Sequence, residues 1–491
     1  MDANSSLPEI PMTEPALRGA SGGLYSAEKL GVAPSTCTTA GFNAKALLTG
    51  QRFANLFTKE KYFRGTQHDQ KSFDFFQRFS PEPSGIQPLM GSVKAGTYIA
   101  LDERRPCAPF RQTRKIVRGF TSFVFGKDRW PSIKVDGDAD TQAFAEGLVR
   151  AARLPNVMLR ARTLGGSVGT VGLSWRYWEG TPRVQIHNAR SLYVHAWADR
   201  EQLIPAHVTE VIAFERDGWD PKENRATKET WWRRRDWTET ADVVFVDVQE
   251  SDEPAWVIDD SDGATFVHDD GFCHFVWVQN LPDLDGSSED GESDVETLYS
   301  SLDMGDIVNS VLMLAGAQNL DPTVVLGVAK DEVGGEVSLG SNNALALGQG
   351  GTASFLSLPS DLITAGKELL GELSSQVHEV TGFVSPDPDK IAAAGTSGKA
   401  LELLYGPMVQ AADTLREQYG RVIEQLLEQM IASARRRAPE ADEDGELYYP
   451  VETTGQLEEA NEGETEVSFF VKLPPAFTGN SSMISTVAGA L

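Results

Sequence analysis

Apolar residues recur at three- and four-residue spacing in three long stretches of the second half of the chain, as on one face of an α-helix. These stretches predict helices over 295–319, 360–380 and 397–437. Asp321-Pro322 follows the first helix and Thr381-Gly382 stops the second, because proline and glycine disfavour further helical turns. Gly406 and Pro407 lie inside the third helix, where proline removes a backbone donor, so we expect a kink there.

The middle of the chain contains short runs of β-branched and aromatic residues, separated by turn signals at a spacing of roughly 8–12 residues. This pattern predicts an antiparallel β layer. The runs lie at 168–177, 183–187, 193–195, 206–215, 230–237, 243–248, 255–258, 265–267 and 273–278. Further strands are expected at 132–135, 324–328, 345–347, 354–358 and 466–472, and a further helix at 140–153.

The first forty or so residues mix Ser, Pro, Gly and Thr without a period, which predicts an extended arm or disorder. Between 45 and 79, aromatic residues lie among Lys and Arg. Short helices with an apolar side explain them better than a surface that stacks on bases. The elements together predict the α+β class, and 491 residues correspond to about three folding units.

Charge narrows the range of functions. The chain has 44 Lys and Arg against 71 Asp and Glu, a net charge of −27, although 41% hydrophobic residues still provide a sizeable core. A protein that grips DNA needs a basic face, so this balance disfavours a generic nucleic-acid grip. Residues 236–329 contain neither Lys nor Arg.

Three scattered cysteines, Cys37, Cys107 and Cys273, are too few for a disulfide framework and favour synthesis in a reducing cytoplasm. No secretory signal is visible in residues 1–20. The longest apolar helical stretch, 307–320, is shorter than the roughly 20 residues that span a bilayer. The sequence therefore predicts a soluble protein.

Motifs for catalysis are incomplete. Residues 395–399 resemble half of a phosphate-binding loop, but Ala393 and Ala400 replace the required glycine and hydroxyl residue. Glycines between 165 and 172 lead into a strand rather than out of one, which is the wrong order for a dinucleotide site. The basic and aromatic run at 231–237 alternates faces as a strand, so we interpret it as packing plus salt bridges.

His268, Cys273 and His274 could form a metal-binding corner with Asp269 or Asp270. No second Cys/His cluster completes a structural zinc site, so we interpret them as ordinary strand residues. We therefore expect no catalytic residue, cofactor or metal, and a chain built for architecture.

The order of segments resembles a known architecture. A strand pair at 169–175 and 181–186 precedes a strand that ends in Asn280, just before the first long helix. Residues 397–408, which open the third helix, are the most specific local match, and 472–477 form a further one. From about Arg111 to Phe477 the chain resembles the portal (connector) proteins of tailed bacteriophages, the rings at one capsid vertex through which DNA is packaged and ejected.

The resemblance implies a division of the chain along its length. The parts are an N-terminal arm and outer wing (1–110), an α/β wing (111–294), a first stem helix (295–321), a β clip (322–359), a second stem helix (360–382), a tunnel loop (383–396), a long kinked helix (397–437), an acidic segment with a returning wing strand (438–477) and the start of a short or truncated crown (478–491).

The resemblance also implies which residues carry function. Residues expected at the tunnel loop and DNA channel are Pro386, Asp387, Asp389, Lys390 and Lys399, and the helix kink is expected at Gly406 and Pro407. Residues expected to dock the motor or adaptor at the clip are Val324, Lys330, Asp331, Glu332 and Glu336.

Several partners follow from the resemblance. They are further copies of the chain in a closed ring, twelve in the family's assembled particle, double-stranded DNA in the channel, the terminase motor, a head–tail adaptor, and the major capsid and scaffolding proteins, with no membrane. The protein would be made in the bacterial cytoplasm and reside in the virion, and ATP hydrolysis would belong to the terminase.

Two alternatives stay open. Another head–tail ring component is disfavoured by length, because adaptors are usually much shorter. A metal-dependent nuclease would use Asp387 and Asp389 to coordinate Mg²⁺, although carboxylates near proline turns are common in ordinary loops.

Overall fold

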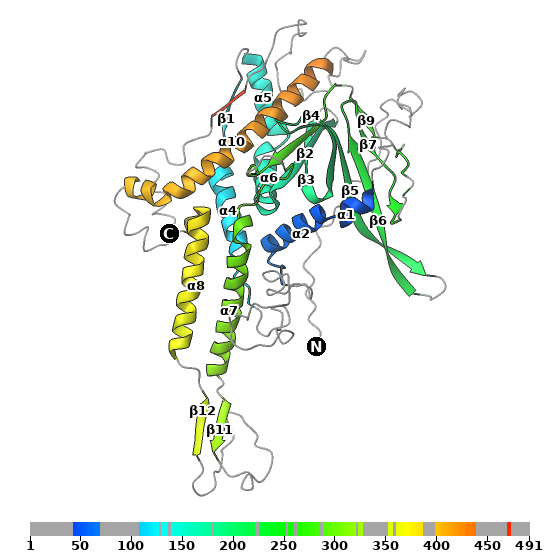
Figure 1. Cartoon of the computed structure of the whole chain (residues 1–491). Coiled ribbons are helices and arrows are strands. Elements are labelled where there is room, and N and C mark those ends of the chain that lie inside the picture. Colours follow the sequence, from blue (N-terminus) through cyan, green and yellow to red (C-terminus); the bar gives the residue numbers. More distant parts are fainter. Residues whose placement is uncertain are drawn as a thin grey trace.

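A helical hairpin projects from a body of packed helices and antiparallel sheets in the computed structural model (Figure 1). The mixture of helices and strands confirms the α+β class. The structure describes residues 43–68, 108–126, 129–135, 139–178, 181–220, 225–251, 254, 256–259, 261, 263–268, 270–283, 288–320, 323–327, 352–356, 360–385, 398–437 and 469–472.

A three-stranded sheet lies at the centre of the body. Its middle strand is β2 (Thr170–Trp178), which pairs antiparallel with β3 (Thr181–Asn188) on one edge and with β10 (Phe275–Gln279) on the other. The first six residues of β2 are buried, as expected for a strand covered on both faces. The strand pair that the sequence predicted at 169–175 and 181–186 is therefore present.

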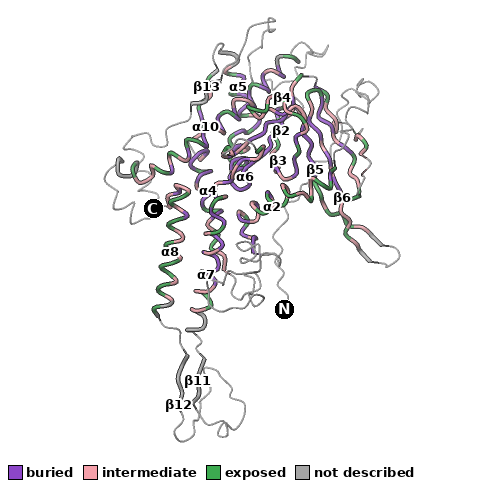
Figure 2. Tube along the Cα trace, in the orientation of Figure 1, coloured by how far each residue is buried: buried purple, intermediate pink, exposed green. Residues whose placement is uncertain are grey.

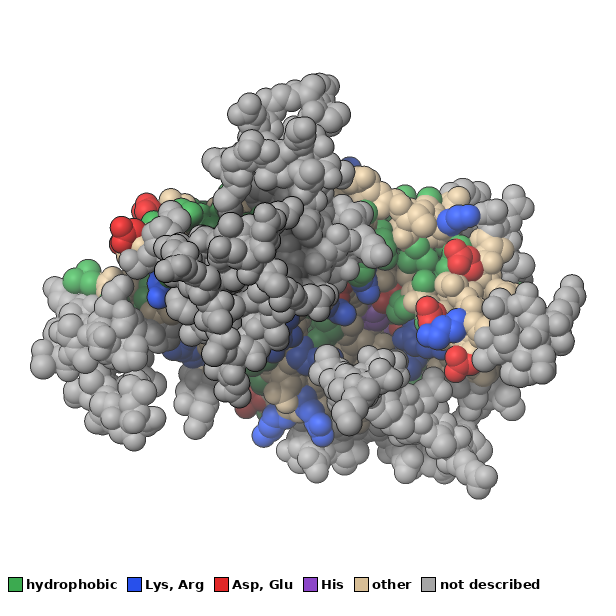
Figure 3. All heavy atoms as spheres, turned by 90° about the horizontal axis from the view of Figure 1, so that it is seen from below, with side chains coloured by type: hydrophobic (Ala, Val, Ile, Leu, Met, Phe, Trp, Pro, Cys, Tyr) green, Lys and Arg blue, Asp and Glu red, His purple; other side chains and the backbone are tan. Residues whose placement is uncertain are grey.

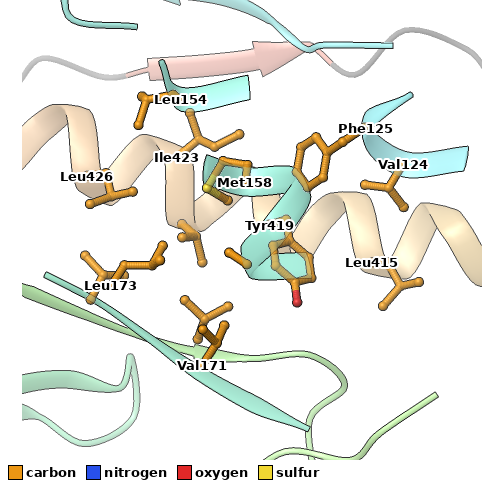
Figure 4. Close-up of a cluster of buried hydrophobic side chains, with 14 of the residues drawn as sticks. Val124, Phe125, Leu154, Met158, Val171, Leu173, Leu415, Tyr419, Ile423 and Leu426 are labelled. Carbon is orange, nitrogen blue, oxygen red and sulfur yellow. The ribbon is translucent and has the colours of Figure 1, made fainter. Parts of the chain in front are cut away.

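Helices pack on this sheet to form the main core. They are α4 (Gln112–Phe125), α5 (Ala139–Ala151), α6 (Leu154–Val168) and the long α10 (Gly398–Arg437). Figure 4 shows side chains of α4, α6, β2 and α10 meeting in one cluster, with Met158 and Tyr419 at its middle. Both residues are almost completely shielded from solvent.

Helix α6 is a correction to the sequence prediction, which placed a strand from 168 and no helix before it. Arg160, Arg162, Gly165 and Gly166 interrupt its apolar pattern. The helix forms because its apolar residues reach the main core, so tertiary packing outweighs the weak local signal.

A second antiparallel sheet lies beside the first, in the order β4-β5-β6-β7-β9, with the short β8 also paired to β6. The strands are β4 (Leu192–Asp199), β5 (Ile204–Asp220), β6 (Arg225–Trp237), β7 (Ala241–Val244), β8 (Val248–Gln249) and β9 (Phe266–Val267). In the basic run of β6, Arg233 bonds Asp247 and the buried Arg234 bonds Asp236. The interpretation of this run as packing plus salt bridges is confirmed.

A distant strand returns to the body. Strand β13 (Phe469–Lys472) pairs antiparallel with β1 (Ser132–Val135), so the chain's late segment joins a strand formed more than three hundred residues earlier. The sequence predicted a strand at this late position without its partner.

The helical hairpin consists of α7 (Tyr299–Leu320), preceded by the 3₁₀ turn η5 (Glu296–Leu298), the strand pair β11 (Thr323–Gly327) and β12 (Thr352–Leu356), and α8 (Ser360–Thr381). Helices α7 and α8 lie side by side, each 22 residues long, or about 33 Å. Figures 1 and 2 show them leaving the body, where most of the buried residues lie, with β11 and β12 at the far end.

Residues near the N-terminus pack on the body. Helix α1 (Ala44–Thr49) is followed by α2 (Gln51–Arg64), whose Tyr62 is buried in the main core and stacks on Tyr299 at the start of α7. The first forty or so residues, expected as an arm, lie outside the described residues.

Acidic side chains of the cation-free stretch 236–329 find their partners in these N-terminal helices. Arg52 binds Asp290 through two hydrogen bonds of 2.6 and 2.7 Å, and Lys59 binds Glu296 at 2.6 Å. These pairs hold α2 against the segment that enters the helical hairpin.

A buried ion pair joins the helical hairpin to the body. The side chain of Arg162 on α6 is fully buried and donates from Nη2 to both carboxylate oxygens of Asp294, each at 3.0 Å. Asn280, at the end of β10, donates to the same carboxylate, and its oxygen lies 3.3 Å from the Tyr419 hydroxyl of α10. Burial raises the pKa of Tyr419, so this hydroxyl stays protonated and donates.

We predict that Arg162→Met lowers the free energy of unfolding by about 3–5 kcal/mol, because it leaves the Asp294 carboxylate buried without its cation. Urea unfolding followed by tryptophan fluorescence measures the loss. Arg421→Met is the matched control, since Arg421 pairs with Glu417 on the exposed side of α10 and should change stability by less than about 1 kcal/mol. Equal losses in the two variants would contradict the role of the buried pair.

Candidate functional site at the base of the helical hairpin

The predicted tunnel loop begins at a point that the body holds firmly. Helix α8 ends at Thr381, and Gly382 turns the chain with a left-handed φ of +67°. The next residue, Phe383, is buried in the main core and packs edge-on against Phe120 of α4 at a centroid distance of 5.9 Å. A Cβ at Gly119 would lie 2.2 Å from the Phe383 ring, so only glycine at that position allows this contact.

A row of basic side chains lies beside the start of the predicted tunnel loop. Arg111, Arg114, Lys115 and Arg118, which we call the basic stripe, are all exposed along α4 or at its start. Lys115 Nζ donates to Ser385 Oγ at 2.6 Å, so the stripe touches the first residues of the predicted loop. Figure 3, seen from below, shows Lys and Arg side chains gathered on parts of the described underside.

The sequence prediction missed the basic stripe, although a signal was present. Positions 111, 114, 115 and 118 have the i, i+3, i+4, i+7 spacing of one helical face. The sequence prediction only placed these positions at the start of the expected α/β wing, 111–294. Guanidinium and ammonium groups on one face attract anions, so the stripe gives an otherwise acidic chain a local site for phosphate oxygens or carboxylates.

The helices around this site expose large apolar side chains. The exposed fractions are 52% for Met313 and 40% for Leu314 on α7, 48% for Leu369 and 62% for Val380 on α8, and 73% for Leu403 on α10. Single exposed apolar residues are ordinary on a monomer, but several on adjacent projecting helices are typical of a surface that another protein covers.

Most residues that the resemblance assigned to function lie outside the described residues. These are Pro386, Asp387, Asp389 and Lys390 of the tunnel loop, and Lys330, Asp331, Glu332 and Glu336 of the clip. The backbone of Val324 lies in β11, and that of Lys399 lies in the first turn of α10. Strand β11 lies at the far end of the hairpin and α10 lies on the body, so these two positions belong to different parts of the molecule (Figure 1).

Gly406 and Pro407 lie inside α10, which continues through them from Gly398 to Arg437. Pro407 has no amide hydrogen for the carbonyl of Leu403, so the helix lacks one backbone bond there. The Pro407 carbonyl lies close to Gly382, so this weakened turn of α10 adjoins the end of α8.

No protein-family model matches the chain, and no curated protein matches it. Among the described helices, none is long and apolar enough to cross a membrane.

We predict that Phe383→Ala destabilises the protein by about 3–5 kcal/mol, because it leaves a cavity between α4 and α8 at the start of the loop. The shift of the thermal unfolding midpoint measures this loss. Phe110→Ala, the same substitution at a residue that is 43% exposed, should change stability by roughly 0.5 kcal/mol or less. A similar small effect of both variants would show that Phe383 does not hold the base of the loop.

Proposed function

We propose that the chain is a subunit of a portal ring, a closed channel at one capsid vertex through which double-stranded DNA is packaged, retained and ejected. The observation that carries the proposal is the projecting helical hairpin, with a strand pair at its far end and exposed apolar residues along its helices. The order of wing strands, helix, strand pair, helix, loop and long helix matches the order that the resemblance implies.

The exposed apolar residues support assembly with further copies of the same chain. Met313 and Leu369 lie on adjacent helices that leave the body, so neighbouring subunits can cover them only if the hairpins stand beside one another. A heterologous contact that repeats around an axis closes into a ring. The closed ring thereby removes the apolar surface that a lone subunit exposes.

Charge supports a channel that surrounds DNA and does not grip it. A net charge of −27 per chain, repeated around an axis, repels the phosphate backbone over much of the ring. Lys390 and Lys399 at the predicted tunnel loop, together with the basic stripe beside it, supply the few cations that contact DNA.

Other proteins complete the assembly. A terminase docks at the clip and hydrolyses ATP, and a tail adaptor later occupies the same clip. The wing contacts the capsid.

Negative-stain electron microscopy of the purified protein tests the ring directly. We predict annular particles with an axial hole at micromolar protein concentration. Monomers or dimers at every concentration, including after addition of capsid scaffolding protein, would overturn the proposal.

We predict that Leu369→Glu abolishes or strongly reduces ring formation and leaves the fold of the subunit intact, because a carboxylate replaces an apolar side chain at the proposed subunit contact. Size-exclusion chromatography with light scattering measures assembly, and circular dichroism measures the fold. Gln376→Glu adds the same charge at an exposed polar position of α8 and is the matched control. Normal rings from L369E would place the subunit contact elsewhere.

A further inference from the structure

Three buried side chains from different segments of the body converge where the second sheet meets the three-stranded sheet. They are Asp242 on β7, His268 directly after β9, and His274 directly before β10, and one possible ligand atom from each lies within 4.8 Å of the others. The two imidazole rings stack at a centroid distance of 3.6 Å, and His268 Nε2 lies 3.7 Å from Asp242 Oδ1.

This cluster corrects the metal-binding corner that the sequence offered. His268 and His274 do come together, and Asp270 lies beside both, 2.7 Å from His274 and 3.9 Å from His268. The group of possible ligands also includes Asp242, from an earlier strand, which the sequence did not suggest. Cys273 points into an apolar cluster with Leu192 and Phe275, and burial, assisted by Asp242 and Glu239, raises the pKa of its thiol. Its sulfur is not among the possible ligand atoms that lie within 4.8 Å of one another, so Cys273 is not part of this cluster.

Each of the three side chains leaves one polar atom without a hydrogen-bond partner. The atoms are Asp242 Oδ1, His268 Nε2 and His274 Nδ1, and all three are buried. A buried polar atom without a partner costs roughly 1–3 kcal/mol, and native proteins keep few of them. Three such atoms, on side chains whose possible ligand atoms lie within 4.8 Å of one another, indicate that a bound group satisfies them.

The surroundings orient His274 as a metal ligand. Its Nε2 lies 2.7 Å from Asp270 Oδ2, so the ring proton is donated there, and the lone pair lies on Nδ1, which is buried without a hydrogen-bond partner. Ser433 of α10 donates to the same carboxylate oxygen at 2.6 Å and fixes its position. A carboxylate that holds the far side of an imidazole is the usual support of a metal-bound histidine.

We propose that Asp242, His268 and His274 bind one divalent transition-metal ion, for which Zn²⁺ is the best chemical match. Two imidazole nitrogens and one carboxylate oxygen are typical ligands of Zn²⁺. They argue against Mg²⁺ and Ca²⁺, because these hard cations prefer oxygen ligands alone.

Binding requires local adjustments. The two stacked imidazole rings have to rotate out of parallel, because the lone pair of an imidazole nitrogen lies in the plane of its ring. His268 Nδ1 lies 3.3 Å from the Asp270 amide, and this long hydrogen bond is lost when the ring proton moves to Nδ1 to free the Nε2 lone pair. Arg176 interacts electrostatically with Asp242 and opposes a second positive charge, whereas the carboxylates of Asp242 and Asp270 favour it.

The ion would tie together β7, the turn after β9 and the start of β10, and through Asp270 and Ser433 also α10. Its role is therefore structural: it fixes the second sheet against the long helix. This role is independent of whether the chain forms a ring.

Zinc binding by the full chain, purified without a histidine tag, tests the proposal. After chelator treatment, ZnCl₂ addition and removal of unbound metal by gel filtration, mass spectrometry of elements should find about one Zn²⁺ per chain. Asp242→Asn and His268→Gln should each weaken binding by at least about tenfold. His195→Gln, at a half-buried histidine that bonds Thr209 in the same sheet, should leave it unchanged.

The wild-type protein provides a second readout that does not depend on folding of the variants. Co²⁺ should give visible d–d absorption without strong near-ultraviolet thiolate absorption, because nitrogen and oxygen ligands hold it. No retained metal, equal retention in D242N, H268Q and H195Q, or a thiolate band would each overturn the assignment.

Discussion

The buried pair of Arg162 and Asp294 is the interaction on which the arrangement of the body and the helical hairpin depends. Arg162 belongs to a helix of the core, and Asp294 lies just before the first helix of the hairpin. A buried guanidinium or carboxylate costs several kcal/mol when its partner is missing. The pair therefore favours the position of α6 relative to the start of the hairpin in which Arg162 and Asp294 meet. Asn280 and Tyr419 bring the end of β10 and the long helix α10 to the same point.

Charge in this chain acts as much within the fold as outside it. The stretch 236–329 has no cation of its own, and its acids find partners in α2 and in the turn that follows it, where His68 Nε2 lies 2.9 Å from Asp306. The folded subunit is therefore less acidic at this surface than the sequence suggests. The net charge still sets the electrostatic field far from the protein. Close to the surface, the field depends on which acidic side chains are paired with cations.

Local patterns in the sequence predicted the long helices and most short strands, because helix and strand periodicity reflects which face is buried. Helix α6 could not be predicted, since Arg162 breaks the apolar pattern and its partner lies 132 residues away. The histidine cluster shows the same limit, because no spacing rule connects Asp242 with His274 across the turns between them. The basic stripe was predictable from its helical spacing, whereas its position beside Phe383 needed the fold.

The contacts at the base of the predicted loop tie the start of that loop to α4, α8 and α10. Phe383 fixes the chain where it leaves α8, and the Pro407 carbonyl adjoins Gly382, so both helices that border the loop meet the same side of the core. A displacement of α8 in a ring would therefore move the start of the loop and the weakened turn of α10 together. Because α7 is tied to the core through Asp294, the hairpin cannot slide freely, and coupling between neighbouring subunits would pass through α8.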